Sequence, residues 1–153
     1  MRIFLAGIMQ GSHLGAVLHN QQYRQQLREL LQRHLPQAEI YDPLSDHANS
    51  LDYDERRGRE VFFHHAQLAA EVDLVVAVVP EATMGTAIEM WQAYQAGRAV
   101  LSISPLVHNW AVRFLSHEVY ADLEEFERAL ADGRVARRLR EILGPDRTTA
   151  RRL

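Results

Sequence analysis

The stretch Asp73–Ser104, DLVVAVVPEATMGTAIEMWQAYQAGRAVLSIS, decides the fold of this chain. Its first part, residues 74–79, is an uninterrupted apolar run rich in β-branched residues, which is typical of a parallel strand covered on both faces. The small-residue turn 83–86 (TMGT) leads into a predicted helix that carries one acidic residue, Glu89, in its first turn. A second buried strand is predicted at residues 99–103. Strand, helix and strand in this order favour a parallel α/β sheet.

The overall composition indicates one globular domain. The chain has 153 residues, of which 47% are hydrophobic and 24% are charged, and it contains no cysteine. Its formal net charge of −3 gives no general affinity for nucleic acid, and no apolar run is long enough to span a membrane. Because Met1 leads directly into a predicted strand, we expect no signal peptide and a cytoplasmic location.

The remaining predicted elements alternate in the same way. Further strands are predicted at 2–6, 39–41 and 117–120, and helices at 18–35, 54–70, 122–131 and 134–143. The first strand is expected at the centre of the sheet, and Phe62 is expected in the core. Together they predict a three-layer α/β sandwich with a parallel five-stranded sheet, over residues 1–143. Residues 144–153 are expected to form a flexible basic tail.

Glu89 and the turn before it are open to two interpretations. A glutamate early in a helix can simply be a surface residue that the helix N-terminus stabilises. However, the small residues Thr83, Met84, Gly85 and Thr86 let backbone N–H groups approach a ligand. Open α/β folds bind their ligands at the carboxyl ends of the strands, which is where this turn is predicted. A carboxylate nucleophile there would have to be ionised and held close to the reacting carbon.

The loop after the first strand contains Gly7, Gly11 and Ser12. It can be a tight connection, or a cradle for a phosphate or ribose group. It has neither the Gly-x-Gly-x-x-Gly spacing of dinucleotide-binding folds nor the Gly-Lys-Ser/Thr of a P-loop. The sequence therefore supports neither nicotinamide binding nor nucleoside triphosphate hydrolysis.

Acidic residues and histidines follow the second predicted strand. The cluster consists of Asp42, Asp46, His47, Asp52 and Asp54. Its spacing matches no calcium loop or zinc motif, so we interpret it as a solvated loop, with a lid over the site as the alternative. The side chains of His64 and His65 diverge by about 100° on a helix and cannot share one metal ion. We expect no metal and no cofactor.

Three segments together resemble the nucleoside 2-deoxyribosyltransferase family, including the 2′-deoxynucleoside 5′-monophosphate N-glycosidases. The resemblance covers about residues 2–130. Residues 2–12 (RIFLAGIMQGS) look like the first strand and ribose or phosphate loop of the family, and residues 41–44 (YDPL) resemble its second strand exit. The strongest similarity is at residues 73–103, with an Asp-apolar strand, a small-residue turn, a catalytic glutamate and a helix ending in Gly-Arg.

This resemblance implies a flavodoxin-like, Rossmann-like fold and a double-displacement mechanism. Glu89 would attack C1′ of the sugar and expel the base, and water or a second base would resolve the glycosyl ester. The implied catalytic residues are Glu89, His65 and Asp73. The implied substrate-binding residues are Gly7, Gln10, Gly11, Ser12, Asp42, Thr83, Met84, Gly85, Thr86 and Asn109. The resemblance also implies a homodimer or larger homo-oligomer, in which Asn109 reaches the 5′ end of the sugar in a partner subunit.

Two departures from the family pattern keep a second hypothesis open. His65 stands where the family generally carries an aspartate that assists the leaving base, and a histidine can protonate a base near neutral pH. Gln10 and His13 stand where the phosphate-binding branch usually has an arginine and more serines. The leading hypothesis is an enzyme that cleaves or exchanges the N-glycosidic bond of a nucleoside or nucleoside 5′-monophosphate. The alternative is a non-catalytic nucleotide-binding or sensing module on the same fold.

Overall fold

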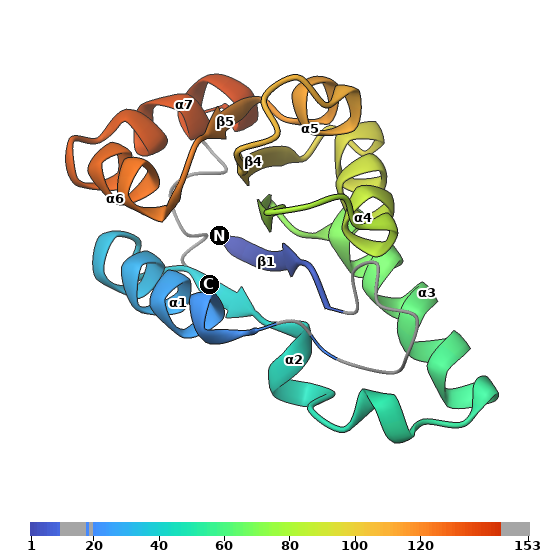
Figure 1. The fold of residues 1–153 in the computed structure, drawn as a ribbon. Coiled ribbons are helices and arrows are strands. Elements are labelled where there is room, and N and C mark those ends of the chain that lie inside the picture. Colours follow the sequence, from blue (N-terminus) through green and yellow to red (C-terminus); the bar gives the residue numbers. More distant parts are fainter. Residues whose placement is uncertain (10–17, 19, 145–153) are drawn as a thin grey trace.

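The predicted parallel five-stranded sheet is confirmed. The computed structural model describes residues 1–9, 18 and 20–144, and the predicted basic tail lies almost entirely outside them. The strands are β1 (Arg2–Gly7), β2 (Glu39–Tyr41), β3 (Leu74–Val78), β4 (Ala99–Ile103) and β5 (Glu118–Tyr120). All neighbours pair in parallel, in the order β2-β1-β3-β4-β5 (Figure 1). β3 therefore occupies the middle of the sheet, whereas we expected β1 there; β1 is the interior strand beside it.

Helices cover both faces of the sheet, as the alternation of elements predicts. They are α1 (Gln22–His34), α2 (Pro43–Asp46), α3 (Glu55–Glu71), α4 (Met84–Gln95), α5 (Trp110–Leu115), α6 (Leu123–Ala131) and α7 (Arg134–Leu143), with a 3₁₀ turn, η1, at Ser50–Asp52. In Figure 1, α1, α6 and α7 lie on one face, and α3, α4 and α5 lie on the other. No helix among the described residues combines the length and apolarity that a membrane span requires.

Two cores form because successive strand residues point to opposite faces. On β1, Ile3 and Leu5 pack with the cluster under α1, α6 and α7, whereas Phe4 and Ala6 pack with the cluster under α3, α4 and α5. Every residue of β3 is buried, which explains why its sequence is continuously apolar rather than alternating. This strand therefore anchors both layers of helices.

Two local expectations are wrong. The segment after β2 is not only a loop, because Asp42 caps α2 by accepting a hydrogen bond from the Leu44 N–H, and Pro43 occupies the first helical position. Phe62, expected in the core, is 43% exposed. It lies on α3 beside the cavity described next, so the helical apolar pattern marked a cavity wall rather than a core position.

Candidate active site

A cavity of about 310 Å³ opens where the strand order reverses between β1 and β3. This reversal is the place where open α/β folds bind ligands, outside the carboxyl ends of the strands. The cavity, called the Glu89 cavity below, is lined by Gly7, Met9, Phe62, His65, Ala66, Thr83, Met84, Gly85, Thr86, Ile88 and Glu89. Seven of the residues expected at the site therefore surround one space.

The start of α4 forms one side of this cavity. Thr83 precedes the helix in an extended conformation, and its side chain makes no capping hydrogen bond to the helix. The Thr83 hydroxyl lies 3.5 Å from the hydroxyl of Thr86, which is buried. We expected Glu89 in the first turn of this helix. Because α4 begins at Met84, Glu89 is in the second turn instead. The favourable field of a helix N-terminus falls off within the first turn, so it contributes little to Glu89.

The carboxyl group of Glu89 is partly buried in the cavity wall. Burial raises the pKa of Glu89 from its ordinary value near 4.5 to about 8, and the nearby positive charge of Arg24 opposes that rise. The free protein therefore holds Glu89 mostly protonated at neutral pH. This differs from the ionised glutamate that a nucleophile requires, and it makes the ionised form dependent on pH.

His65 projects from α3 into the same cavity and is surrounded by aromatic rings. Its Nε2 atom lies 3.2 Å from the Tyr41 hydroxyl, and its ring lies 5.1 Å from the ring of His47. Burial, followed by the neighbouring His47 and His64, lowers the pKa of His65 to about 4. His65 is therefore neutral at pH 7, whereas a histidine that protonates a base must first be in its cationic form. It can still donate one N–H hydrogen bond.

Asp42, expected to bind substrate, is engaged in a buried ion pair instead. Its Oδ1 atom lies 2.9 Å from Nη1 of Arg24, and the two side chains are 8% and 3% exposed. The second oxygen, Oδ2, lies 3.5 Å from the Arg28 guanidinium, and Oδ1 also accepts the Leu44 N–H. The carboxylate thus holds the exits of β1 and β2 together, and it does not line the Glu89 cavity.

Arg24 is the residue of this region that the sequence interpretation missed. Arg24 is buried, although charged side chains on a helix usually face solvent. The signal was present in the spacing, because Arg24 stands three and seven residues before Leu27 and Leu31, on the apolar stripe of α1. Arginine is rarely buried without a partner, so this position also called for a buried carboxylate.

Asp73 lies at the amino ends of the strands, whereas Glu89 lies beyond their carboxyl ends. Its Oδ2 atom accepts a hydrogen bond of 2.8 Å from the backbone N–H of Arg2, next to the amino ends of β1 and β3. The structure therefore does not bring Asp73 to the cavity, because a residue at the start of a parallel strand is separated from the site by the length of that strand. Gln10, Gly11 and Ser12 lie outside the described residues.

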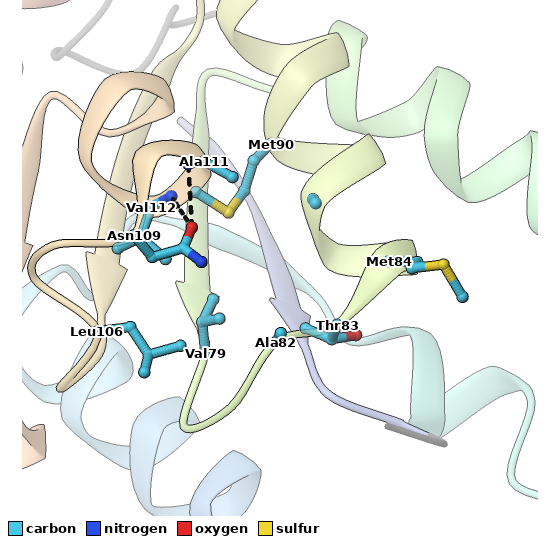
Figure 2. Close-up of a pocket in the computed structure, with 10 residues that line it drawn as sticks. Val79, Ala82, Thr83, Met84, Met90, Leu106, Asn109, Ala111 and Val112 are labelled. Atoms are coloured by element: carbon cyan, nitrogen blue, oxygen red, sulfur yellow. Dashed lines mark hydrogen bonds between the residues drawn. The ribbon is translucent and has the colours of Figure 1, made fainter. Parts of the chain in front are cut away.

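Asn109 lines a different cavity, which lies between α4 and α5 (Figure 2). This second cavity has a volume of about 410 Å³ and shares Thr83 and Met84 with the Glu89 cavity. The side-chain oxygen of Asn109 accepts the N–H groups of Ala111 and Val112 and so caps α5. In Figure 2 the amide nitrogen of Asn109 points away from α5 and toward the cavity. Within one chain, Asn109 and Glu89 therefore face separate spaces.

Comparisons with known proteins identify the fold. No protein-family model matches the sequence, and no curated protein matches it. Among solved structures, the 2-deoxyribosyltransferase of Bacillus psychrosaccharolyticus is 16% identical, with a TM-score of 0.63 over 83% of this chain and 90% of that chain. A conserved protein of Enterococcus faecalis V583 is also 16% identical, with a TM-score of 0.61 over 86% and 97%.

A third structural neighbour is the CMP N-glycosidase BcmB of Clostridium botulinum. It is 18% identical, with a TM-score of 0.52 over 86% of this chain and 98% of that chain. The alignments cover 90–98% of these neighbours and 83–86% of this chain, so the similarity concerns the whole domain and not a shared substructure. At the level of the fold, the chain is therefore similar to the 2-deoxyribosyltransferase of Bacillus psychrosaccharolyticus and to the CMP N-glycosidase BcmB.

Proposed function

We propose that this protein cleaves or exchanges the N-glycosidic bond of a nucleoside or nucleoside 5′-monophosphate. The observation that carries the proposal is the position of Glu89, on the wall of a cavity at the carboxyl ends of parallel strands. No hydrogen bond to its carboxyl group comes from the part of the chain that the structure describes. The structural neighbours from Bacillus psychrosaccharolyticus and Clostridium botulinum support the same reaction class.

The reaction would proceed in two displacements at the sugar carbon C1′. Glu89 first loses its proton to solvent. A carboxylate oxygen of Glu89 then forms a bond to C1′ as the N-glycosidic bond breaks, and the bonding electron pair leaves with the base, which takes up a proton from solvent. Water or a second base then attacks C1′ and releases the Glu89 carboxylate. Two inversions retain the configuration of the sugar, as in retaining glycosidases.

His65 would assist the departing base as a neutral hydrogen-bond donor. Burial raises the pKa of Tyr41, so its hydroxyl keeps a proton that it can donate to Nε2 of His65. The Nδ1 atom of His65 then carries the ring proton, and this N–H group can donate a hydrogen bond to a lone pair on the base. This role needs no imidazolium and fits the low pKa of His65.

The start of α4 offers a place for the 5′ end of the substrate. Backbone N–H groups in the first turn of a helix attract anions, and Gly85 has open space at the position of a Cβ atom. The Thr83 and Thr86 hydroxyl groups lie beside them and can donate to a 5′-hydroxyl or a 5′-phosphate.

Release of free base tests the proposal directly. The protein would be incubated with a panel of ribo- and deoxyribonucleosides and their 5′-monophosphates, with and without an acceptor base, and products separated by chromatography. Free base without acceptor indicates a hydrolase, and a new nucleoside formed only with acceptor indicates a transferase. Glu89→Gln should reduce either rate at least about 10³-fold, by loss of the nucleophile.

The matched control is Glu55→Gln, which makes the same chemical change at an exposed position on α3, away from the cavity. It should leave the rate unchanged. Full activity in Glu89→Gln would eliminate the proposed mechanism.

The protonation states of the cavity favour a second candidate function, a nucleotide-binding module without turnover. Both Glu89 and His65 are predominantly neutral at pH 7, so the cavity presents no formal charge from either of them. Calorimetry distinguishes this candidate from the enzyme. Tight binding of a nucleotide with no base released between pH 6 and pH 9 would support the binding module.

We further propose a homodimer in which Asn109 serves the active site of the partner subunit. Trp110 and Phe114 on α5 are 76% and 54% exposed, beside the second cavity, and a second copy of the chain would cover them. A mixing experiment tests the shared site. Glu89→Gln and Asn109→Ala are each expected to be inactive alone, and mixed dimers should recover activity because one of their two sites contains both native residues.

A further inference from the structure

A buried guanidinium lies directly behind the wall of the Glu89 cavity. Arg24 has its Nη2 atom 3.2 Å from the carbonyl oxygen of Gly7 and 3.5 Å from the sulfur of Met9, and both residues line the cavity. Its Nη1 atom donates to the carbonyl oxygen of Leu5 at 3.1 Å. Arg24 therefore contacts the cavity wall from inside the protein and holds the carboxyl end of β1.

Arg24 lies in a cluster of two guanidinium groups and one carboxylate. Arg24 and Arg28 share one carboxylate, that of Asp42. Arg28 is about one-third exposed, so water screens much of its charge, whereas the charge of Arg24 is buried. Burying a charge is costly unless opposite charge accompanies it, and arginine does not relieve this cost by losing its proton.

Among the described residues, three titratable or charged side chains interact electrostatically with Glu89, and a fourth, His65, lines the same cavity. Tyr23 and Arg24 come from α1, Tyr41 from β2 and His65 from α3. Burial raises the pKa of both tyrosines, and the pKa of His65 is lowered. Of these four groups, Arg24 alone carries a charge at neutral pH.

We propose that Arg24 is a positioning residue that fixes the Gly7 end of β1 and supplies the buried positive charge that favours the ionised Glu89 carboxylate. The inference rests on the proposed function, which makes that carboxylate the nucleophile. Asp42 then acts in the opposite sense, because its negative charge neutralises part of the Arg24 charge. The direction of the Coulombic effect agrees, since Arg24 lowers the pKa of Glu89 against the effect of burial.

The test is a titration of Glu89 that needs no substrate. The protein is labelled with ¹³C at the glutamate carboxyl carbon, and its NMR signals are followed from pH 5 to pH 10. Glu89→Gln identifies the signal by its disappearance. Arg24→Met removes the charge at similar side-chain length, and it should raise the pKa of Glu89 by one unit or more. At pH 7 the ionised fraction then falls about tenfold for each unit.

Two further variants keep the proposal testable if Arg24→Met does not fold. Arg24→Lys retains the charge and should leave the pKa of Glu89 within about half a unit of the wild-type value. Asp42→Asn retains a side chain that can cap α2, and it should lower the pKa of Glu89 by unmasking Arg24. The control Arg28→Gln removes a more exposed charge from the same cluster and should leave the titration nearly unchanged.

Arg24→Met and Asp42→Asn should shift the pKa of Glu89 in opposite directions, which separates an electrostatic role of Arg24 from a structural one. If the role of Arg24 were purely structural, Arg24→Met, Arg24→Lys and Asp42→Asn would each lower the stability of the protein. None of them would then change the pKa of Glu89. An unchanged midpoint in folded Arg24→Met, or a raised midpoint in Asp42→Asn, would overturn the proposal. Because the titration uses no substrate, these results stand apart from the base-release assay, whose failure would count against the proposed function only.

Discussion

Glu89 is a residue whose burial should make the stability of the protein depend on pH. Its folded pKa of about 8 exceeds the ordinary value near 4.5, so the fold favours the protonated form. The stabilisation is fully present below about pH 4.5 and is lost as the pH rises through 8. We therefore expect Glu89→Gln to match the wild-type free energy of unfolding at pH 5 and to exceed it at pH 8.5, by on the order of 3 kcal/mol.

Chemical denaturation of both proteins at the two pH values measures this difference. His65 also titrates with folding, but it is present in both proteins and cancels from the comparison. Equal stabilities at pH 8.5 would mean that the Glu89 carboxylate is well solvated in the folded state.

Gly7 is a residue at which even one methyl group should disturb the site. A Cβ atom there would lie 2.2 Å from the Tyr23 hydroxyl oxygen and 3.1 Å from its Cζ atom. We expect Gly7→Ala to lower the free energy of unfolding by about 1–3 kcal/mol, since the rigid phenol ring must move. Tyr23→Phe removes the hydroxyl, so the double variant should recover part of the loss.

A double-mutant cycle on urea unfolding reports this coupling. Additive effects of the two substitutions would show that the alanine is accommodated without touching Tyr23.

At the scale of elements, α5 depends on a single cap. Asn109 accepts hydrogen bonds from two N–H groups at the start of this six-residue helix. Asn109→Ala should destabilise the protein by about 1 kcal/mol, whereas Asn109→Ser keeps a capping oxygen and should cost less. Thermal unfolding measures the difference between the two variants.

The same two variants, Asn109→Ala and Asn109→Ser, distinguish a capping role of Asn109 from a role in substrate binding. If the amide of Asn109 serves a partner's active site, both variants lose base release, although Asn109→Ser stays stable. Retained activity in Asn109→Ser would assign Asn109 to capping alone.

At the scale of the whole molecule, the exposed aromatic side chains on α5 predict self-association. We expect the wild-type protein to sediment as a dimer of 17.6 kDa chains, and Trp110→Glu with Phe114→Glu to sediment as a monomer. Gln26→Glu, on α1 at the other face of the sheet, serves as the control and should remain dimeric. A wild-type chain that sediments as a monomer at micromolar concentration would contradict the proposed shared site.

The architecture of this molecule was predictable because its interior strands β3 and β4 are short, fully buried and almost entirely apolar. The bounds of β2 and β4 agree with the sequence prediction, and the predicted bounds of α6 and α7 are correct to within one residue. The short helix α2 was missed although its signal, Asp42 followed by Pro43, was present. Local patterns of hydrophobicity and capping therefore account for most elements.

The sequence by itself determined the order of strands and helices along the chain, the turn before Glu89 and the glutamate that follows that turn. Only the tertiary structure decided which side chains share the cavity and which are charged there. It buried Arg24 against Asp42, separated Asp73 from Glu89 by the length of β3, and left the proton on Glu89 rather than on His65. The physical reason is that pairing, burial and proton affinity depend on groups that are distant in the chain, whereas periodicity and capping depend on near neighbours.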